Sequence, residues 1–111
     1  MESLIADELT IEIKETGNLV FMVWKGKSRH LDPSTILDPY FNKLLPDLVG
    51  KKLEMDFSQL NIMNSSTVPP LLSFIQTLNA NHVNTKVKYD SSRTWQNASF
   101  VPLSIVFTGY D

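Results

Sequence analysis

The apolar run from Leu19 to Trp24 constrains the fold more than any other feature of the sequence. Its residues are apolar at both odd and even positions. Strand side chains point alternately to opposite faces, so such a run predicts a strand buried on both faces, inside a sheet with helices on each side. Residues 9–13 instead alternate apolar with polar, which predicts a half-buried antiparallel partner. The two strands would join through residues 15–18, where Gly17 can adopt positive φ.

Two Asp-Pro pairs, Asp32-Pro33 and Asp38-Pro39, are typical helix starts. Because proline breaks a helix that is already running, we expect a short turn and then a main helix from about Pro39 to Leu48. Gly50 would end it. A second helix is predicted from Val68 to Leu78, where apolar residues recur at helical spacing.

Two further strands are expected at 52–57 and 85–89, with apolar Leu60 and Ile62 just beyond the first. In the last segment, apolar residues at 95, 98, 101 and 105 predict a helix capped by Ser91 or Ser92 and kinked at Pro102. A final strand at 103–107 is the alternative. Strands that alternate with helices predict an α/β fold with right-handed crossovers and a mostly parallel sheet, to which the first strand adds as an antiparallel hairpin strand.

Size and composition exclude several classes of protein. The 111 residues suffice for one core, so we expect a single domain over 1–111. A formal charge of -2 disfavours a general binder of nucleic acid or membrane surfaces. The absence of cysteine excludes disulfides and thiolate metal sites. No apolar run is long enough to span a membrane, and residues 1–4 lack a secretory pattern, so we expect a cytoplasmic protein.

Recognisable catalytic and cofactor motifs are missing. The scattered glycines form neither a dinucleotide-binding nor a Walker-type loop. His30 and His82 fall in predicted connections, where a turn or surface position is favoured over a zinc site. Glu54 and Asp56 share a strand face beside Lys52, a pattern that favours a salt-bridged strand over an acid/base pair. We therefore predict no cofactor and no metal.

The segment Asn64-Ser65-Ser66-Thr67 lies between a central strand and the clearest helix. Open α/β sheets place functional residues at the carboxyl ends of parallel strands. The same residue types are ordinary helix caps, because their oxygens accept hydrogen bonds from first-turn amides. Local chemistry alone favours capping.

The wider pattern resembles the core of the STAS family, the sulfate transporter and anti-sigma-factor antagonist domains. Such domains carry an apolar strand ending in Asp-hydrophobe-Ser, a short apolar bridge, and Asp-Ser-Ser-Gly opening an amphipathic helix. Here the counterparts are Asp56-Phe57-Ser58, the bridge at 60–63, and Asn64-Ser65-Ser66-Thr67. The likeness is specific over Leu53 to Leu78, weaker over 9–48 and poor beyond Tyr89. It implies a STAS-like α/β domain.

The resemblance implies a regulator rather than an enzyme. In the antagonist branch, the first serine of this motif is phosphorylated by a partner serine kinase of the anti-sigma type, which breaks the complex, and a phosphatase restores it. By position, Ser65 would be the phosphate acceptor, with Ser66 and Thr67 as alternates. ATP would belong to the kinase. Oligomeric state is not predicted.

Two departures from the family pattern bear on this expectation. Asn64 replaces the usual Asp and lacks its negative charge. Thr67-Val68-Pro69-Pro70 replaces the Gly-hydrophobe-Gly start of the helix. Prolines are tolerated in a first helical turn, but Pro69 and Pro70 remove two N–H groups that could otherwise hold a phosphate.

The resemblance also implies a partner surface made of this loop and the exposed side of the following helix. Its expected residues are Met63, Asn64, Ser65, Ser66, Thr67, Val68, Pro69, Pro70, Ser73, Gln76 and Thr77. One rival is a ligand-sensing or structural STAS-like domain in which residues 64–67 only cap the helix. The other is a small hydrolase that uses Asp56, Ser65 and His82.

Overall fold

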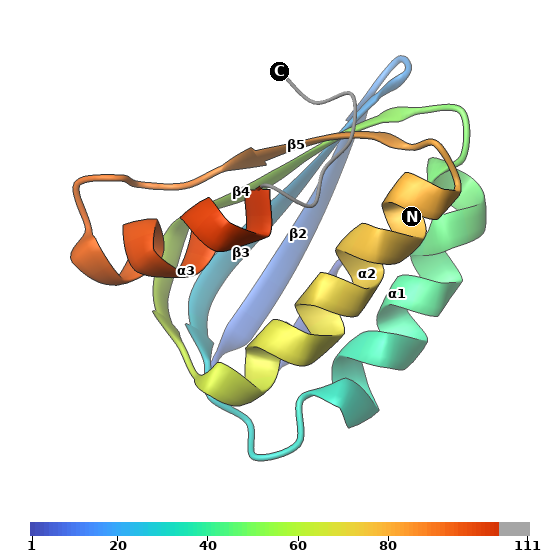
Figure 1. Ribbon diagram of the computed structural model, residues 1–111. Coiled ribbons are helices and arrows are strands. Elements are labelled where there is room, and N and C mark those ends of the chain that lie inside the picture. The colour runs from blue at the N-terminus through green and yellow to red at the C-terminus, as the bar shows by residue number, and fades with distance from the viewer. Residues whose placement is uncertain (105–111) are drawn as a thin grey trace.

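The computed structural model describes residues 1–104, which form one five-stranded sheet with three helices (Figure 1). The sheet order follows the sequence: β1 (Leu4–Ala6), β2 (Leu9–Thr16), β3 (Leu19–Ser28), β4 (Lys52–Met63) and β5 (Asn84–Lys88). The helices are α1 (Ser34–Leu48), α2 (Val68–Ala80) and α3 (Thr94–Ser104), and a 3₁₀ turn, Ser65–Thr67, precedes α2. The predicted α/β class is confirmed, as is the predicted order of elements from β2 to α3.

Strand directions divide the sheet into an antiparallel and a parallel half. β3, β4 and β5 are parallel, whereas β2 pairs antiparallel with β3, as predicted. Gly17 in the β2–β3 turn has φ of 59°, the positive value expected from the sequence. The short β1, antiparallel to β2, was not predicted, because its three residues are too few to show a period.

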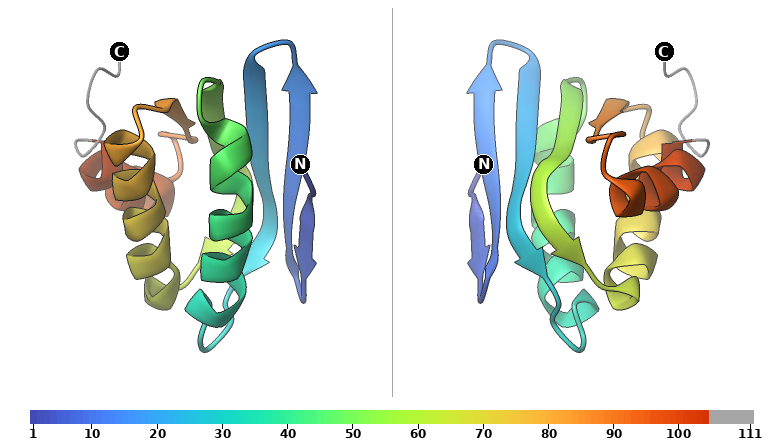
Figure 2. Two further views of the ribbon diagram at one scale, coloured as in Figure 1. Left: turned by 90° about the vertical axis from the view of Figure 1, so that its right-hand side faces the viewer. Right: turned by 90° about the vertical axis from the view of Figure 1, so that its left-hand side faces the viewer.

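The helices cover one face of the sheet, so the prediction of helices on both faces is wrong for residues 1–104. α1 and α2 lie against the same face, and no helix of the described residues lies across the opposite face (Figure 2). Along β3, Met22 and Trp24 are fully buried, but Phe21 and Val23 are only partly covered. Their cross-strand neighbours on β2 are Lys14 and Glu12. Such long charged side chains shield apolar neighbours with their stems while their charges stay in water.

α1 begins at Ser34 and continues through Pro39, so the predicted break at that proline is also wrong. Pro39 follows the first turn, so it removes a single intrahelical hydrogen bond. Leu37 and Tyr40 on either side of it are buried in the core. Tertiary packing therefore offsets the local cost.

β4 runs to Met63 rather than ending near Phe57. Its register against β3 shifts twice, between Val23 and Lys25 and between Gly26 and Lys27. Each bulge inserts an extra residue in β4, which breaks the alternation in the sequence. At the first bulge, Asp56 Oδ1 accepts hydrogen bonds from the backbone N–H and hydroxyl of Ser58, at 2.8 and 2.7 Å. The Asp-hydrophobe-Ser motif therefore shapes the strand.

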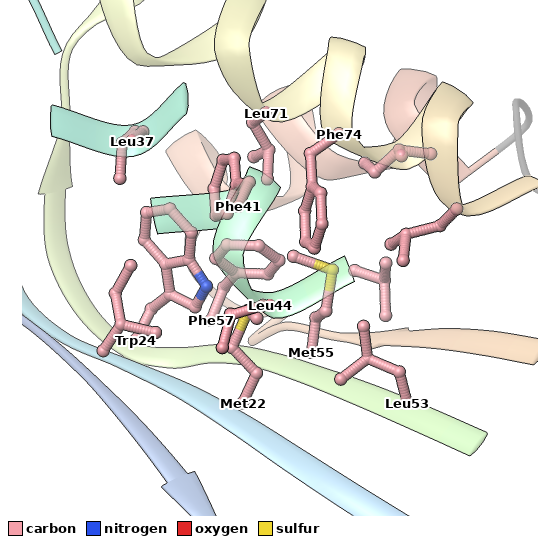
Figure 3. Packing of buried hydrophobic residues seen from close by; sticks show 14 of the residues in the cluster. Met22, Trp24, Leu37, Phe41, Leu44, Leu53, Met55, Phe57, Leu71 and Phe74 are labelled. Atoms are coloured by element: carbon pink, nitrogen blue, oxygen red, sulfur yellow. The ribbon is translucent and has the colours of Figure 1, made fainter. Parts of the chain in front are cut away.

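The core is one cluster between the inner face of the sheet and the helices (Figure 3). Trp24 of β3 and Phe57 of β4 have ring centroids 5.2 Å apart. Phe41 of α1 stacks on Phe74 of α2 at 4.0 Å. Phe100 of α3 stacks on Phe57 at 4.3 Å.

α3 covers the part of β4 that β5 leaves unpaired, because β5 pairs only with Lys52–Asp56. The buried Gln96 donates from Nε2 to the carbonyls of Phe57 and Leu60, at 2.8 and 2.9 Å. Arg93 also donates to the Leu60 carbonyl at 3.0 Å. These side chains supply the donors that a further stretch of β5 would have supplied.

The start of α3 differs from the prediction, because neither Ser91 nor Ser92 is its cap. Ser92 donates its N–H and hydroxyl to Asp90 Oδ1 instead, and these bonds hold the pKa of the Asp90 carboxyl below its usual value. The helix begins at Thr94. Residues 103 and 104 are helical, which excludes a strand there, and residues 105–107 of the alternative strand lie outside the described residues.

Replacing Gln96 with leucine should destabilise the fold. Gln96→Leu keeps the approximate volume but removes the amide donor from the buried Phe57 carbonyl, leaves the Leu60 carbonyl with Arg93, and removes the acceptor of the Asp90 N–H, so we expect a loss of about 2 kcal/mol in the free energy of unfolding. Urea denaturation measures it. The matched control is the exposed Gln76→Leu on α2, expected within about 0.5 kcal/mol of wild type. Equal effects at the two positions would contradict the role assigned to Gln96.

Gly26 and Gly17 offer a second matched pair. Both have positive φ, but a Cβ on Gly26 would lie 2.1 Å from the Glu8 carbonyl oxygen, whereas no atom of the described residues lies within 4 Å of a Cβ on Gly17. Gly17→Ala should cost roughly 1–2 kcal/mol of unfolding free energy from backbone strain. Gly26→Ala should cost more, because the β1–β2 turn must also move away. Equal losses on urea denaturation would show that the close approach has no energetic consequence.

Candidate functional site

The Asn64–Thr67 loop leaves the carboxyl end of β4, in the parallel half of the sheet, and leads directly into α2. In Figure 1 it lies at the lower end of the sheet, where the yellow-green chain turns into α2. Pro69 and Pro70 fall in the first turn of α2, the placement expected from the sequence. Backbone N–H groups in a first turn have no intrahelical partner, so the prolines cost the helix little.

A buried hydrogen-bond network fixes the loop to the end of β3. The Thr67 hydroxyl donates to Asn64 Oδ1 at 2.7 Å and lies 2.8 Å from the hydroxyl of Ser28. Thr67 and Ser28 are 0% and 3% exposed. Because the single Thr67 proton is used on Asn64, the Ser28 hydroxyl is the donor to Thr67.

Asn64 connects the loop to the β3–α1 connection through both backbone and side chain. Its backbone N–H donates to the Ser28 carbonyl and its Nδ2 to the His30 carbonyl, each at 2.9 Å. An aspartate could not make the second bond, because a carboxylate only accepts. The amide therefore supplies both a donor and an acceptor. Neither the Asn64 nor the Thr67 side chain accepts a bond from a first-turn amide, so the side-chain capping expected from local chemistry does not occur.

The expected site residues divide by exposure. Ser65, Ser66 and Pro69 are exposed in the loop and first turn, as are Ser73 and Gln76 further along α2. Met63, Asn64, Val68 and Thr77 are partly exposed.

Thr67 and Pro70 do not fit the surface expected from the sequence, because both are buried. Thr67 is a structural residue whose hydroxyl is engaged on both sides, and the folded chain does not offer it as a phosphate acceptor. Pro70 packs into the interior, on the buried side of α2.

The hydrolase site of the rival interpretation is not assembled. His82 follows the far end of α2 from Ser65, and the helix between them spans roughly 20 Å at its ordinary rise. A general base must come within hydrogen-bond reach of its nucleophile. Within residues 1–104, no three His, Asp or Glu side chains gather in a way that could hold a metal ion. No helix in that range is long and apolar enough to span a bilayer.

Two of the exposed serines, Ser66 and Ser73, line a cleft of about 490 Å³ between the starts of α1 and α2, whereas Ser65 does not line it. Ser66, Pro69 and Ser73 line one side. The other side includes Asp32 and Asp38, two carboxylates that sequence reasoning did not connect with this loop. No local pattern could have connected them, because the chain brings them together only through the packing of α1 against α2.

The fold is similar to that of a solved anti-sigma factor antagonist from Mycobacterium paratuberculosis. The TM-score is 0.68, over 96% of this chain and 90% of that one. The expected STAS-like fold is thereby confirmed. Sequence identity is 16%, a level at which the likeness concerns the fold alone.

Crystal structures of Mglu are also similar over part of their length. One matches with a TM-score of 0.56 and 16% identity, over 68% of this chain and 18% of that one. The native form in 4.3 M NaCl matches with a TM-score of 0.54 and 13% identity, over 78% and 27%. The chain thus spans less than a third of either. No protein-family model and no curated protein matches the sequence.

The Thr67 network should contribute measurably to stability. Thr67→Val removes the hydroxyl, keeps the shape, and leaves Asn64 Oδ1 and the Ser28 hydroxyl without that partner, so we expect a loss of about 1–3 kcal/mol in unfolding free energy. The control is Thr77→Val on α2, where the hydroxyl bonds only to the exposed Ser73 carbonyl. In a double-mutant cycle, Ser28→Ala should be non-additive with Thr67→Val by roughly 0.5 kcal/mol or more. Strict additivity would argue against a shared network.

Proposed function

We propose that the chain is a non-enzymatic regulator that binds a partner protein through the loop around Ser65 and releases it when Ser65 is phosphorylated. The partner would be a serine kinase of the anti-sigma type, and a phosphatase would act in the opposite direction. The setting would be the cytoplasm. The shared fold with an anti-sigma factor antagonist supports the general class, and the exposure of Ser65 on an anchored loop supports the mechanism.

The loop combines an exposed acceptor with a rigid base. Ser65 and Ser66 face solvent, while Asn64 and Thr67 on either side of them are held by hydrogen bonds to β3 and its connection. A kinase can therefore reach the serine hydroxyls without unfolding the chain. The fixed base gives the loop one shape, which lowers the entropy lost on docking.

The start of α2 is poorly suited to bind a phosphate on Ser65, and this favours release of the partner protein after phosphorylation. Helix N-termini ordinarily bind phosphate through free backbone N–H groups. Pro69 and Pro70 lack that group, so a phosphate on Ser65 has fewer donors within its own chain. Its charge, about -1.5 to -2, would stay at the contact surface, next to Ser66, which lines a cleft that also includes the carboxylates of Asp32 and Asp38. Repulsion and desolvation would then oppose the bound state.

The proposed contact surface is the exposed part of the loop and of α2. Its fully exposed members are Ser65, Ser66, Pro69, Ser73 and Gln76, joined by the partly exposed Met63, Asn64, Val68 and Thr77. Ser66 is the alternate acceptor, because it is exposed in the same turn.

A pull-down from native lysate, read by mass spectrometry, tests the proposal. Wild type and Ser65→Ala should both recover a serine kinase, and Ser65→Asp should lose it by tenfold or more, since about 1.4 kcal/mol of repulsion gives that factor. The control Ser91→Asp adds the same charge at an exposed serine of the turn before α3 and should recover the kinase at the wild-type level.

Incubation of the purified chain with the recovered kinase and ATP should then place phosphate on Ser65. Phosphate on Ser66 alone would identify Ser66, rather than Ser65, as the residue whose phosphorylation releases the partner. Equal recovery of the same proteins by wild type, Ser65→Ala and Ser65→Asp would overturn the proposal and favour a ligand-sensing or structural domain.

A further inference from the structure

A second cleft, of about 540 Å³, lies between the β1–β2 turn, the end of β3 and the start of α1. These segments meet at the same end of the molecule (Figure 2). Ligand sites in proteins commonly occupy about 300–1,000 Å³, are mainly apolar, and carry a few polar groups at fixed positions. The size of this cleft falls in that range.

Apolar side chains from three segments form the wall of the cleft. Leu9 of β2 and Leu37 of α1 are buried at its base, and Pro33 and Ile36 extend the wall along the start of α1. Leu31 lies at the mouth with 94% of its surface exposed. A leucine so uncovered has apolar area that a bound molecule would remove from water.

The charged groups of the cleft compensate one another. Glu8 pairs with both Lys27 and Arg29. His30 Nε2 lies 4.0 Å from Asp7 Oδ2, a contact that is an ion pair only when the imidazole is protonated, so the charges that balance are the carboxylates of Asp7 and Glu8 against Lys27 and Arg29. A charged ligand would have to compete with these pairs, whereas an uncharged one leaves them intact.

From the size and lining of this cleft, we propose that it binds a small uncharged molecule with an apolar body of two to three rings. The apolar wall and Leu31 would cover the body of the ligand. The balanced ion pairs would discriminate against anions and cations. The cleft shares Leu31 and Pro33 with the cleft beside Ser66, but Ser65 does not line it, and ligand binding there does not depend on phosphorylation.

The cleft is joined to the Asn64–Thr67 loop through its own wall. Ser28 and His30 line the cleft, and their carbonyls accept hydrogen bonds from the N–H and Nδ2 of Asn64. A ligand that shifts residues 28–30 would change the two hydrogen bonds that Asn64 donates to them. The amide signals of Asn64 should therefore respond to binding although Asn64 does not line the cleft.

The probe for the first test is N-phenyl-1-naphthylamine, an uncharged two-part aromatic amine whose fluorescence rises in apolar surroundings. We expect saturable binding to the wild-type chain with one probe per molecule. Leu31→Asn should raise the dissociation constant about tenfold, because most of the apolar burial of one leucine is lost. Val49→Asn, at an apolar residue of 52% exposure beyond the end of α1, should leave it unchanged.

Two further measurements make the test decisive. The anionic 8-anilinonaphthalene-1-sulfonate should bind at least tenfold more weakly than the uncharged probe. In ¹⁵N NMR titration, shifts should concentrate in residues 6–9 and 27–37, with Asn64 included. Non-saturable binding, an equal loss in Leu31→Asn and Val49→Asn, or tighter binding of the anion would each overturn the proposal. Because no kinase or phosphate is involved, these outcomes leave the proposed switch at Ser65 untouched.

Discussion

A chain of buried aromatic rings holds the helices against the sheet. Phe74 of α2 stacks on Phe41 of α1, Phe41 contacts Trp24 of β3, Trp24 contacts Phe57 of β4, and Phe57 stacks on Phe100 of α3. Large rings bury much area, and paired rings add further attraction. The rings fix how α1 and α2 lie relative to β3 and β4. The position of the loop between β4 and α2, and of both clefts beside α1, depends on that packing.

The loop itself shows how a surface can be exposed and rigid together. Its two outer serines face solvent, while the flanking Asn64 and Thr67 bond inward to Ser28 and His30. A buried hydroxyl must be paired to avoid a desolvation cost, so this network favours a single loop conformation. Substitution of Asn for the usual Asp is consistent with the network, because the amide both donates and accepts.

Much of the fold followed from periodicity, and the errors have identifiable causes. α2, with the longest helical pattern, was predicted nearly as it occurs, whereas β2 and β3 run three and four residues beyond the residues that predicted them. The helix break at Pro39 was wrong because core packing on both sides outweighs one lost hydrogen bond. The early end of β4 was wrong because bulges interrupt the alternation. At the site, the loop was identified from its residues and the family resemblance, but the burial of Thr67 was not, since its partner Ser28 is distant in sequence.

Local patterns of apolar and polar residues alone determined the order of elements from β2 to α3, the parallel crossovers and the place of the Ser65 loop at a strand end. They suffice because side-chain period and turn chemistry are properties of neighbouring residues. Tertiary structure decided which face of the sheet the helices cover, which loop hydroxyls remain exposed, and which carboxylates and apolar side chains line the clefts. Those features arise from contacts between residues far apart in the chain, such as Gln96 with the β4 carbonyls, and no local pattern encodes them.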